Sequence, residues 1–309
     1  MDYLLFAIGL ALLLWGADRM VDATTGLARR LGVSTLTTAV VVVGFGTSMP
    51  ELLTSLDAAL QGSSALAIAN VVGSNTANIL LVIGLSAFCV PLRCDPGSMR
   101  RDLPSLVLAS VLVLFAMQLS TIERWMGLIL AAGLLVYLAI MLATFRSDQS
   151  IVGNQVSAGS GPGVVSGMIR SLLSIAVLLA GAHLLVNGAL GIADRHGVSE
   201  SLIGLTLVAV GTSLPELAVA TLALLRRNAE VAIGNIIGST LFNLLGVLGI
   251  TALVSPLVVP DAIARFDVWI MLAAVLALTV FVRTGWQVNR AEGAVLLSGY
   301  PIYLSLLVA

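Results

Sequence analysis

The chain has 309 residues, of which 59% are hydrophobic and only 10% are charged, and its formal net charge is -1. This composition lies outside the range of soluble globular domains and predicts an integral membrane protein. It excludes nucleic acid as a partner, because the sequence has no basic patch that could neutralise phosphates. The two cysteines, Cys89 and Cys94, match neither a zinc pattern nor a redox CxxC motif.

About twenty apolar residues cross the hydrocarbon core of a bilayer, so the Arg, Pro and Gly-rich interruptions of the sequence divide it into predicted membrane helices. The first apolar run has no basic start and leads into further runs, so we expect a helix and not a cleaved signal peptide. The ten predicted helices are 3–27, 34–60, 64–90, 103–120, 124–145, 165–192, 199–225, 229–255, 266–283 and 288–308. Residues 147–163 are rich in Gly, Ser, Asn and Gln, and we expect a flexible linker there.

The distribution of arginine predicts the orientation of the helices. The loops after odd-numbered helices hold eleven Arg residues and the loops after even-numbered helices hold three, with Arg19 inside the first helix. Cytoplasmic loops of membrane proteins carry the excess of positive charge. We therefore expect the odd-numbered loops in the cytoplasm and both termini on the extracytoplasmic side.

The sequence contains an internal repeat at a spacing of 165 residues. Gly46–Leu52 reads GTSMPEL and Gly211–Leu217 reads GTSLPEL, and roughly 29 of the 76 residues from Gly16 to Pro91 recur 165 positions later. Five helices per repeat is an odd number, so the second copy enters the membrane in the opposite orientation, as in many secondary transporters. We predict an all-α membrane protein of ten helices in two inverted repeats, 1–146 and 164–309, with the substrate site near mid-membrane between them.

Each copy of the motif places an acid and a proline inside an apolar helix. A charged side chain at this depth costs at least ~2.5–3.5 kcal/mol, so Glu51 and Glu216 are functional candidates. Pro50 and Pro215 lack an N–H and clash with the carbonyl four residues earlier, so each helix must bend or unwind there. Backbone oxygens freed in this way are tolerated only where they face protein or a wet cavity.

The polar side chains in and after both motifs offer oxygen ligands alone. No His or Cys joins them, which disfavours zinc and copper and favours a hard cation. Calcium takes 6–8 oxygens at ~2.3–2.6 Å, two carboxylates balance its charge, and sodium could use the same atoms. Packing between helices is the alternative role for such small polar residues. The candidates are Glu51, Glu216, Thr47, Ser48, Thr212 and Ser213, with Ser74, Asn78, Ser239 and Asn243 at helical spacing in the following helices.

With these two motifs the chain resembles the cation/calcium exchanger superfamily, in particular its prokaryotic sodium/calcium exchanger-like branch. The resemblance implies that the second, third, seventh and eighth helices form the core, and that the first and sixth slide past it. It also implies a transporter in a prokaryotic inner or plasma membrane, and neither an enzyme, a resident cofactor nor an obligate protein partner. Its transported ions would be Ca²⁺ and Na⁺ or H⁺.

The same resemblance implies specific ligands at matching positions of this sequence. Calcium would be held by Glu51 and Glu216 together with the backbone carbonyls of Thr47 and Thr212. Sodium would occupy this region and neighbouring sites through Gly44, Ser48, Ser74, Ala209, Ser213 and Ser239. Relatives often carry Asp where this chain has Asn78 or Asn243, and that difference weakens an expectation of potassium co-transport.

The function expected from these features is calcium/sodium antiport by alternating access, with a proton/cation antiporter as the alternative. A calcium channel that uses the acidic pair as a selectivity ring is a second alternative, although rings usually close by symmetry around an axis along the membrane normal. An intramembrane enzyme is a third, but the sequence has no HExxH motif and no Ser/His partnership.

Overall fold

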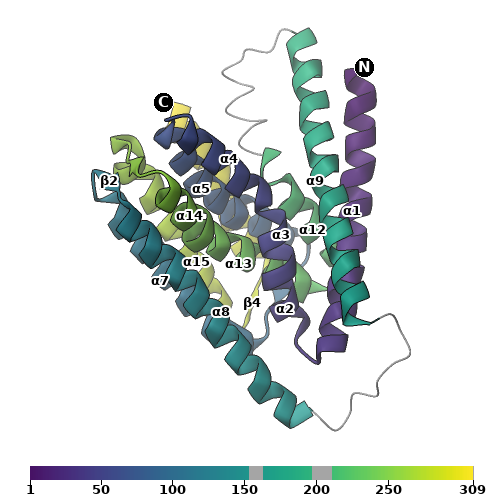
Figure 1. Ribbon diagram of the computed structural model, residues 1–309. Helices are drawn as coiled ribbons and strands as arrows, with labels where there is room; N and C mark the ends of the chain where they lie inside the picture. The colour runs from purple at the N-terminus through teal and green to yellow at the C-terminus, as the bar shows by residue number, and fades with distance from the viewer. Residues whose placement is uncertain (153–162, 197–210, 309) are drawn as a thin grey trace.

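The computed structural model describes residues 1–152, 163–196 and 211–308, and nearly all of this part of the chain is helical (Figure 1). Within it, seven helical segments are both long and apolar enough to cross a membrane. Both termini lie at the same end of the helix bundle, as an even number of crossings requires (Figure 1). The prediction of a ten-helix membrane protein built from two repeats is confirmed.

In the first repeat, the second and third predicted helices are each divided into several shorter elements, and the other three are single helices. They are α1 (Asp2–Leu31); α2 (Thr35–Thr38), η1 (Ala39–Gly44), α3 (Phe45–Thr47) and α4 (Met49–Leu60); α5 (Ser64–Ala77), η2 (Asn78–Ile83) and α6 (Gly84–Cys89); α7 (Pro96–Met117); and α8 (Arg124–Val152). The elements written η are π-helical, a geometry found most often at functional sites.

The described elements of the second repeat follow the same order. They are α9 (Val164–Arg195); α12 (Leu214–Leu225); α13 (Ala229–Leu241), η4 (Phe242–Val247) and α14 (Leu248–Val254); η5 (Ile263–Asp267) and α15 (Val268–Arg283); and α16 (Arg290–Val308). The first half of the predicted helix 199–225 and residues 153–162 of the predicted linker lie outside the described residues. So does Ala209, one of the predicted sodium ligands.

Two predicted boundaries are wrong by several residues. The fifth helix is predicted to end at residue 145, but α8 continues to Val152 and so includes the first residues of the predicted linker. The sequence pattern predicts that the fourth helix begins at residue 103, but α7 begins at Pro96. The side chain of Asp95 accepts a hydrogen bond of 2.7 Å from the backbone N–H of Ser98 and thereby caps the helix. The arginines at 100 and 101 therefore lie in the first turns of a helix and not in a loop.

Short strands, which the sequence did not predict, join the two repeats at both ends of the bundle. β1 (Leu92–Arg93) pairs antiparallel with β4 (Gln287–Val288), and β2 (Thr121–Ile122) pairs antiparallel with β3 (Leu257–Val258). The first pair joins two odd-numbered loops and the second joins two even-numbered loops. Loops of equal parity meet only when an even number of helices crosses the membrane between them, so both pairs agree with the predicted order of crossings.

The helices α1 and α9 stand together along one side of the bundle (Figure 1). They pack backbone against backbone: a Cβ added at Gly16 would lie 2.7 Å from the backbone nitrogen of Leu178, and one added at Gly181 would lie 2.3 Å from that of Leu13. Small residues that let two backbones approach this closely are typical of helix pairs in membranes. The two helices therefore form one closely packed unit.

Candidate ion-binding site

The two GTSxPE motifs produce the same break in the helix. At Ser48 the backbone has φ -86° and ψ 7°, and at Ser213 it has φ -89° and ψ 4°. Pro50 and Pro215 each lie in the first turn of the helix that follows, where the missing N–H has no intrahelical acceptor to lose. The predicted bend is confirmed, and it falls two residues before each proline.

The helix break places Glu51 and Glu216 in the first turns of α4 and α12, and neither side chain has any exposed surface. Ser48 of the first repeat donates a hydrogen bond of 3.4 Å to Oε1 of Glu216 in the second repeat. The acids from the two repeats therefore converge on one buried region.

Two asparagines hold the backbone at these acids in matching ways. Asn70 Nδ2 donates to the backbone oxygen of Glu51 at 3.1 Å, and Asn235 Nδ2 donates to the backbone oxygen of Glu216 at 3.2 Å. Asn235 also accepts a hydrogen bond of 3.2 Å from the Thr47 hydroxyl. The structure therefore gives these two asparagines a positioning role.

A group of hydroxyls gathers around Glu216. Ser239 Oγ lies 3.3 Å from Oε1 of Glu216, 3.0 Å from the carbonyl oxygen of Gly44 and 3.1 Å from Thr47 Oγ1. This approach requires glycine at position 44, because an added Cβ would lie 2.6 Å from the backbone nitrogen of Ser239. Five of the predicted ligands, Thr47, Ser48, Gly44, Ser239 and Glu216, thus form one hydrogen-bonded group.

The remaining predicted ligands that the structure describes are buried, except for the half-buried Thr212, and most lack partners. Ser74 Oγ lies 3.5 Å from Thr212 Oγ1. Buried polar atoms are normally hydrogen-bonded, because an unpaired one costs about 1–3 kcal/mol. Among the described residues, the buried polar atoms without a hydrogen-bond partner include both carboxylate oxygens of Glu51, Oε2 of Glu216, the hydroxyl of Ser213 and the amide groups of Asn78 and Asn243.

This donor set suits a transported hard cation. Carboxylate, amide and hydroxyl oxygens are the ligands that Ca²⁺ and Na⁺ accept, and coordination would satisfy atoms that are otherwise unpaired. Within the described part of the chain, no three His, Cys, Asp or Glu side chains come together as a metal-holding cluster. The site therefore offers two acids and several neutral oxygens, a set that can bind an ion and release it. Which of these residues coordinate stays a prediction.

A repeated acid outside the site was missed by sequence reasoning. Asp102 on α7 accepts hydrogen bonds from Arg101 and from Tyr137 on α8, the latter at 3.1 Å. Asp267, 165 positions later, accepts one of 2.9 Å from Tyr303 on α16. The spacing could have revealed the pair, but the repeat was traced only as far as Pro91. These contacts tie the fourth helix of each repeat to the fifth.

Comparison with known proteins agrees with this geometry. The family described as "Sodium/calcium exchanger protein" matches residues 1–143 and 166–309. The putative antiporter CaxA of Alkalimonas amylolytica is 37% identical over 97% of this chain and 96% of its own length. The sodium/calcium exchanger MaX1 of Methanosarcina acetivorans is 31% identical, with 99% and 98% covered, and the inner membrane protein YrbG of Escherichia coli is 33% identical, with 98% and 95% covered.

The same likeness extends to solved structures. The structure of the sodium-calcium exchanger NCX_Mj soaked with 2.5 mM Na⁺ and 0.1 mM Ca²⁺ superposes with a TM-score of 0.85 at 30% identity, covering 98% of this chain and 97% of its own. The match spans both repeats and leaves no large part of the chain unaccounted for. The chain therefore belongs to the sodium/calcium exchanger protein family and is a multi-pass membrane transporter, not an enzyme.

Proposed function

We propose that the chain is a secondary active antiporter that exchanges calcium for sodium across a membrane by alternating access. The observation that carries the proposal is the convergence of two fully buried glutamates from inverted repeats, with three of their four carboxylate oxygens unpaired among the described residues. Membership of the exchanger family supports it, as do the relatives that are themselves named sodium/calcium exchangers.

In this proposal calcium is held by the carboxylates of Glu51 and Glu216 and by the backbone carbonyls of Thr47 and Thr212. The amide oxygens of Asn78 and Asn243 complete its surroundings, because they are buried and unpaired in the described structure. Sodium uses the oxygens of Gly44, Ser48, Ser74, Ala209, Ser213 and Ser239 in addition to the two acids. The repeats at 1–146 and 164–309 contribute equivalent ligands on either side of the linker at 147–163.

The charge of the site explains why exchange would be obligatory. Two carboxylates without a neutralising cation in an apolar interior repel each other and resist desolvation, so the ion-free protein changes its access state slowly. One calcium ion or several sodium ions remove this cost. The two loads compete for the same oxygens and cannot bind together, so each passage in one direction carries one kind of ion.

Sodium is favoured over a proton as the coupling ion because of the neutral oxygens around the acids. The hydroxyls of Ser48 and Ser239 and the carbonyl of Gly44 converge on Glu216. A proton would need only the carboxylate, whereas a sodium ion needs several oxygens around it. A proton/calcium antiporter is the alternative function.

Calcium uptake into liposomes that contain the purified protein tests both parts of the proposal. We expect uptake when the liposomes are loaded with sodium and diluted into sodium-free buffer, and none when only a pH gradient is imposed. Uptake driven by the pH gradient alone would support the proton alternative, and uptake without any counter-gradient would support a channel.

The site assignment is tested in the same assay with single substitutions. Glu51→Gln and Glu216→Gln are each expected to reduce sodium-driven uptake to the level of empty liposomes. Glu123→Gln is the matched control, because this exposed glutamate lies in the loop before α8, away from the site. Unchanged uptake in either site variant would contradict the assignment.

We also propose that the protein lies in a prokaryotic inner membrane with both termini extracytoplasmic. The excess of arginine in the odd-numbered loops supports this orientation, and the relative YrbG is named an inner membrane protein. Cysteine labelling from each side, with single cysteines at the N-terminus and at Arg93 in a cysteine-free background, tests it. Labelling of both positions from the same side would contradict the proposal.

A further inference from the structure

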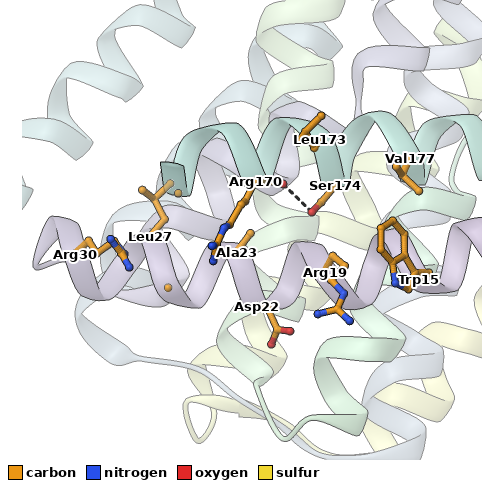
Figure 2. Close-up of a pocket in the computed structure, with 12 residues that line it drawn as sticks. Trp15, Arg19, Asp22, Ala23, Leu27, Arg30, Arg170, Leu173, Ser174 and Val177 are labelled. Atoms are coloured by element: carbon orange, nitrogen blue, oxygen red, sulfur yellow. Dashed lines mark hydrogen bonds between the residues drawn. The ribbon is translucent and has the colours of Figure 1, made fainter. Parts of the chain in front are cut away.

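A pocket outside the ion site lies between the C-terminal half of α1 and the N-terminal half of α9 (Figure 2). Its volume is about 420 Å³. Arg19 and Arg30 line it from α1, and Arg170 enters it from α9, where it lies beside Ala23 (Figure 2). Three arginines from the two helices that stand beside the core therefore line the pocket, spread along its length (Figure 2).

These three arginines have no ion-pair partner among the residues described. The pocket also contains Asp22, but Asp22 is paired with Arg226 at the end of α12, and Arg226 pairs with Asp18 as well. The summed charge of the pocket residues and their ion-pair partners is therefore positive at this end of the α1–α9 pair. Isolated charges beside an apolar phase are costly, so an anion from outside the chain would stabilise them.

At the opposite end of the same helix pair, an acid of the chain itself neutralises an arginine. There Arg195 of α9 forms an ion pair of 2.6 Å with Asp2 of α1, and the Tyr3 hydroxyl lies 3.0 Å from His196. The chain itself supplies the anion at that end. At the pocket end the chain supplies none for three arginines within the described ranges.

The apolar residues of the pocket restrict what kind of anion fits. Trp15 and Leu173 line it and are 52% and 61% exposed, and the Arg19 guanidinium lies 5.8 Å from the centre of the Trp15 ring. Trp15, midway along α1, and Leu173 offer apolar surface at membrane depth, and arginine matches the oxygens of a phosphate with paired N–H groups. A ligand with a phosphate and apolar chains satisfies both sets of residues, whereas a free phosphate satisfies only the arginines.

We propose that this pocket binds the head group of an anionic phospholipid. Its position agrees with this ligand, because the loops that adjoin it are predicted to face the cytoplasm, and basic pockets between membrane helices on that side bind such head groups. The lipid contacts both α1 and α9 and no element of the ion site. It therefore binds to the part of the molecule that the exchange mechanism expects to slide; this step and the cytoplasmic position of the pocket rest on the proposed function and orientation.

Native mass spectrometry of the purified full chain tests binding directly. With phosphatidylglycerol we expect retained lipid adducts, and with phosphatidylcholine of the same chain length about tenfold weaker retention. Replacing Arg19, Arg30 and Arg170 by Gln should lower phosphatidylglycerol retention by about tenfold. Replacing Arg124, Arg265 and Arg290 by Gln, three exposed arginines elsewhere, removes the same charge and should leave retention unchanged.

Two further arms keep the inference falsifiable if the triple variant folds poorly. A phosphatidylglycerol with a photoreactive acyl chain should crosslink the unaltered protein at peptides that contain residues 15–30 and 167–177. Inorganic phosphate at millimolar concentration should not displace the lipid. Crosslinks elsewhere, equal retention in the two triple variants, equal retention of both lipids, or displacement by free phosphate would each overturn the inference.

Discussion

Glu51 and Glu216 occupy equivalent places in the two repeats, yet their surroundings differ. Oε1 of Glu216 accepts hydrogen bonds from Ser48 and Ser239, whereas neither oxygen of Glu51 has a partner among the described residues. The hydroxyl equivalent to Ser48 belongs to Ser213 and is itself unpaired in the described structure. Duplication has thus placed the same acid twice, but only one copy is oriented before an ion binds.

The two acids are therefore not equivalent in energy, although the two repeats match in sequence around them. A carboxylate that already accepts hydrogen bonds recovers part of its lost hydration, and one without them recovers none. We therefore expect Glu51 to depend on a bound cation more than Glu216 does.

The acids should differ in how they respond to calcium. For the unaltered protein in detergent, calcium at 100 times its dissociation constant should stabilise the fold by about 2.7 kcal/mol. Thermal unfolding with and without calcium should show this gain lost in both Glu51→Gln and Glu216→Gln. Without calcium, Glu51→Gln should unfold at a higher temperature than Glu216→Gln, because it removes the acid with no hydrogen bonds. The reverse order would contradict the comparison.

The repeated aspartates of the fourth helices offer a second contrast. Asp102 has no exposed surface and pairs with Arg101 at 2.6 Å as well as with Tyr137, whereas Asp267 is hydrogen-bonded by Tyr303. Asp102→Asn should destabilise the protein by about 2 kcal/mol, because Arg101 and Tyr137 lose a charged hydrogen-bond acceptor. Asp267→Asn should cost about 1 kcal/mol, because the Tyr303 hydroxyl then donates to a neutral amide oxygen instead of a carboxylate. Chemical unfolding followed by tryptophan fluorescence measures both, and equal losses would count against the contrast.

The hydroxyls around the acids should matter unequally. Ser48→Ala with Ser239→Ala removes the donors to Glu216, and Ser213→Ala with Ser74→Ala removes their equivalents in the other half. We expect the first pair to weaken calcium binding by about tenfold, since each lost hydrogen bond is worth ~0.5–1.5 kcal/mol. Isothermal titration with calcium should show a smaller change for the second pair. A larger change there would mean that Ser213 and Ser74 hold the ion more directly than the hydrogen bonds indicate.

The smallest difference is expected between the two positioning asparagines. Asn235 joins the backbone of Glu216 to the Thr47 hydroxyl, while Asn70 joins the backbone of Glu51 to Ser55, away from the other candidate ligands. Asn235→Ala should therefore reduce sodium-driven calcium uptake about twofold to threefold more than Asn70→Ala, a difference of roughly 0.5 kcal/mol. Initial rates in liposomes, normalised to the amount of folded protein, measure it. Equal rates in the two variants would show that the contact with Thr47 adds nothing to transport.

Much of the architecture was accessible from the sequence because the repeat carries it. The apolar runs indicated the number of helices, the two prolines indicated the bends, and the 165-residue spacing indicated that the two acids occupy matching places. Each of these depends on a local property, such as the missing N–H of Pro50 or the cost of a charge at Glu216, and local properties can be read from one segment at a time.

What the sequence could not supply are contacts between segments. Nothing near Ser48 indicates that its hydroxyl reaches the acid of the other repeat, because that contact depends on how α3 and α12 meet. The start of α7 was misplaced since arginines were assigned to loops, although the Asp95 cap draws them into a helix. The strands were missed because β1 to β4 have two residues each, too few for an alternating pattern.

The strand pairs between the repeats limit how the molecule can change shape. β1 with β4 fastens the repeats together at one face of the membrane, and β2 with β3 does so at the other. A rigid-body rotation of one repeat against the other would break both strand pairs. Among the described residues, the α1–α9 pair contains no such strand. We therefore expect α1 and α9 to move against the other helices, so that the boundary between moving and stationary helices runs through each repeat and not between the two repeats.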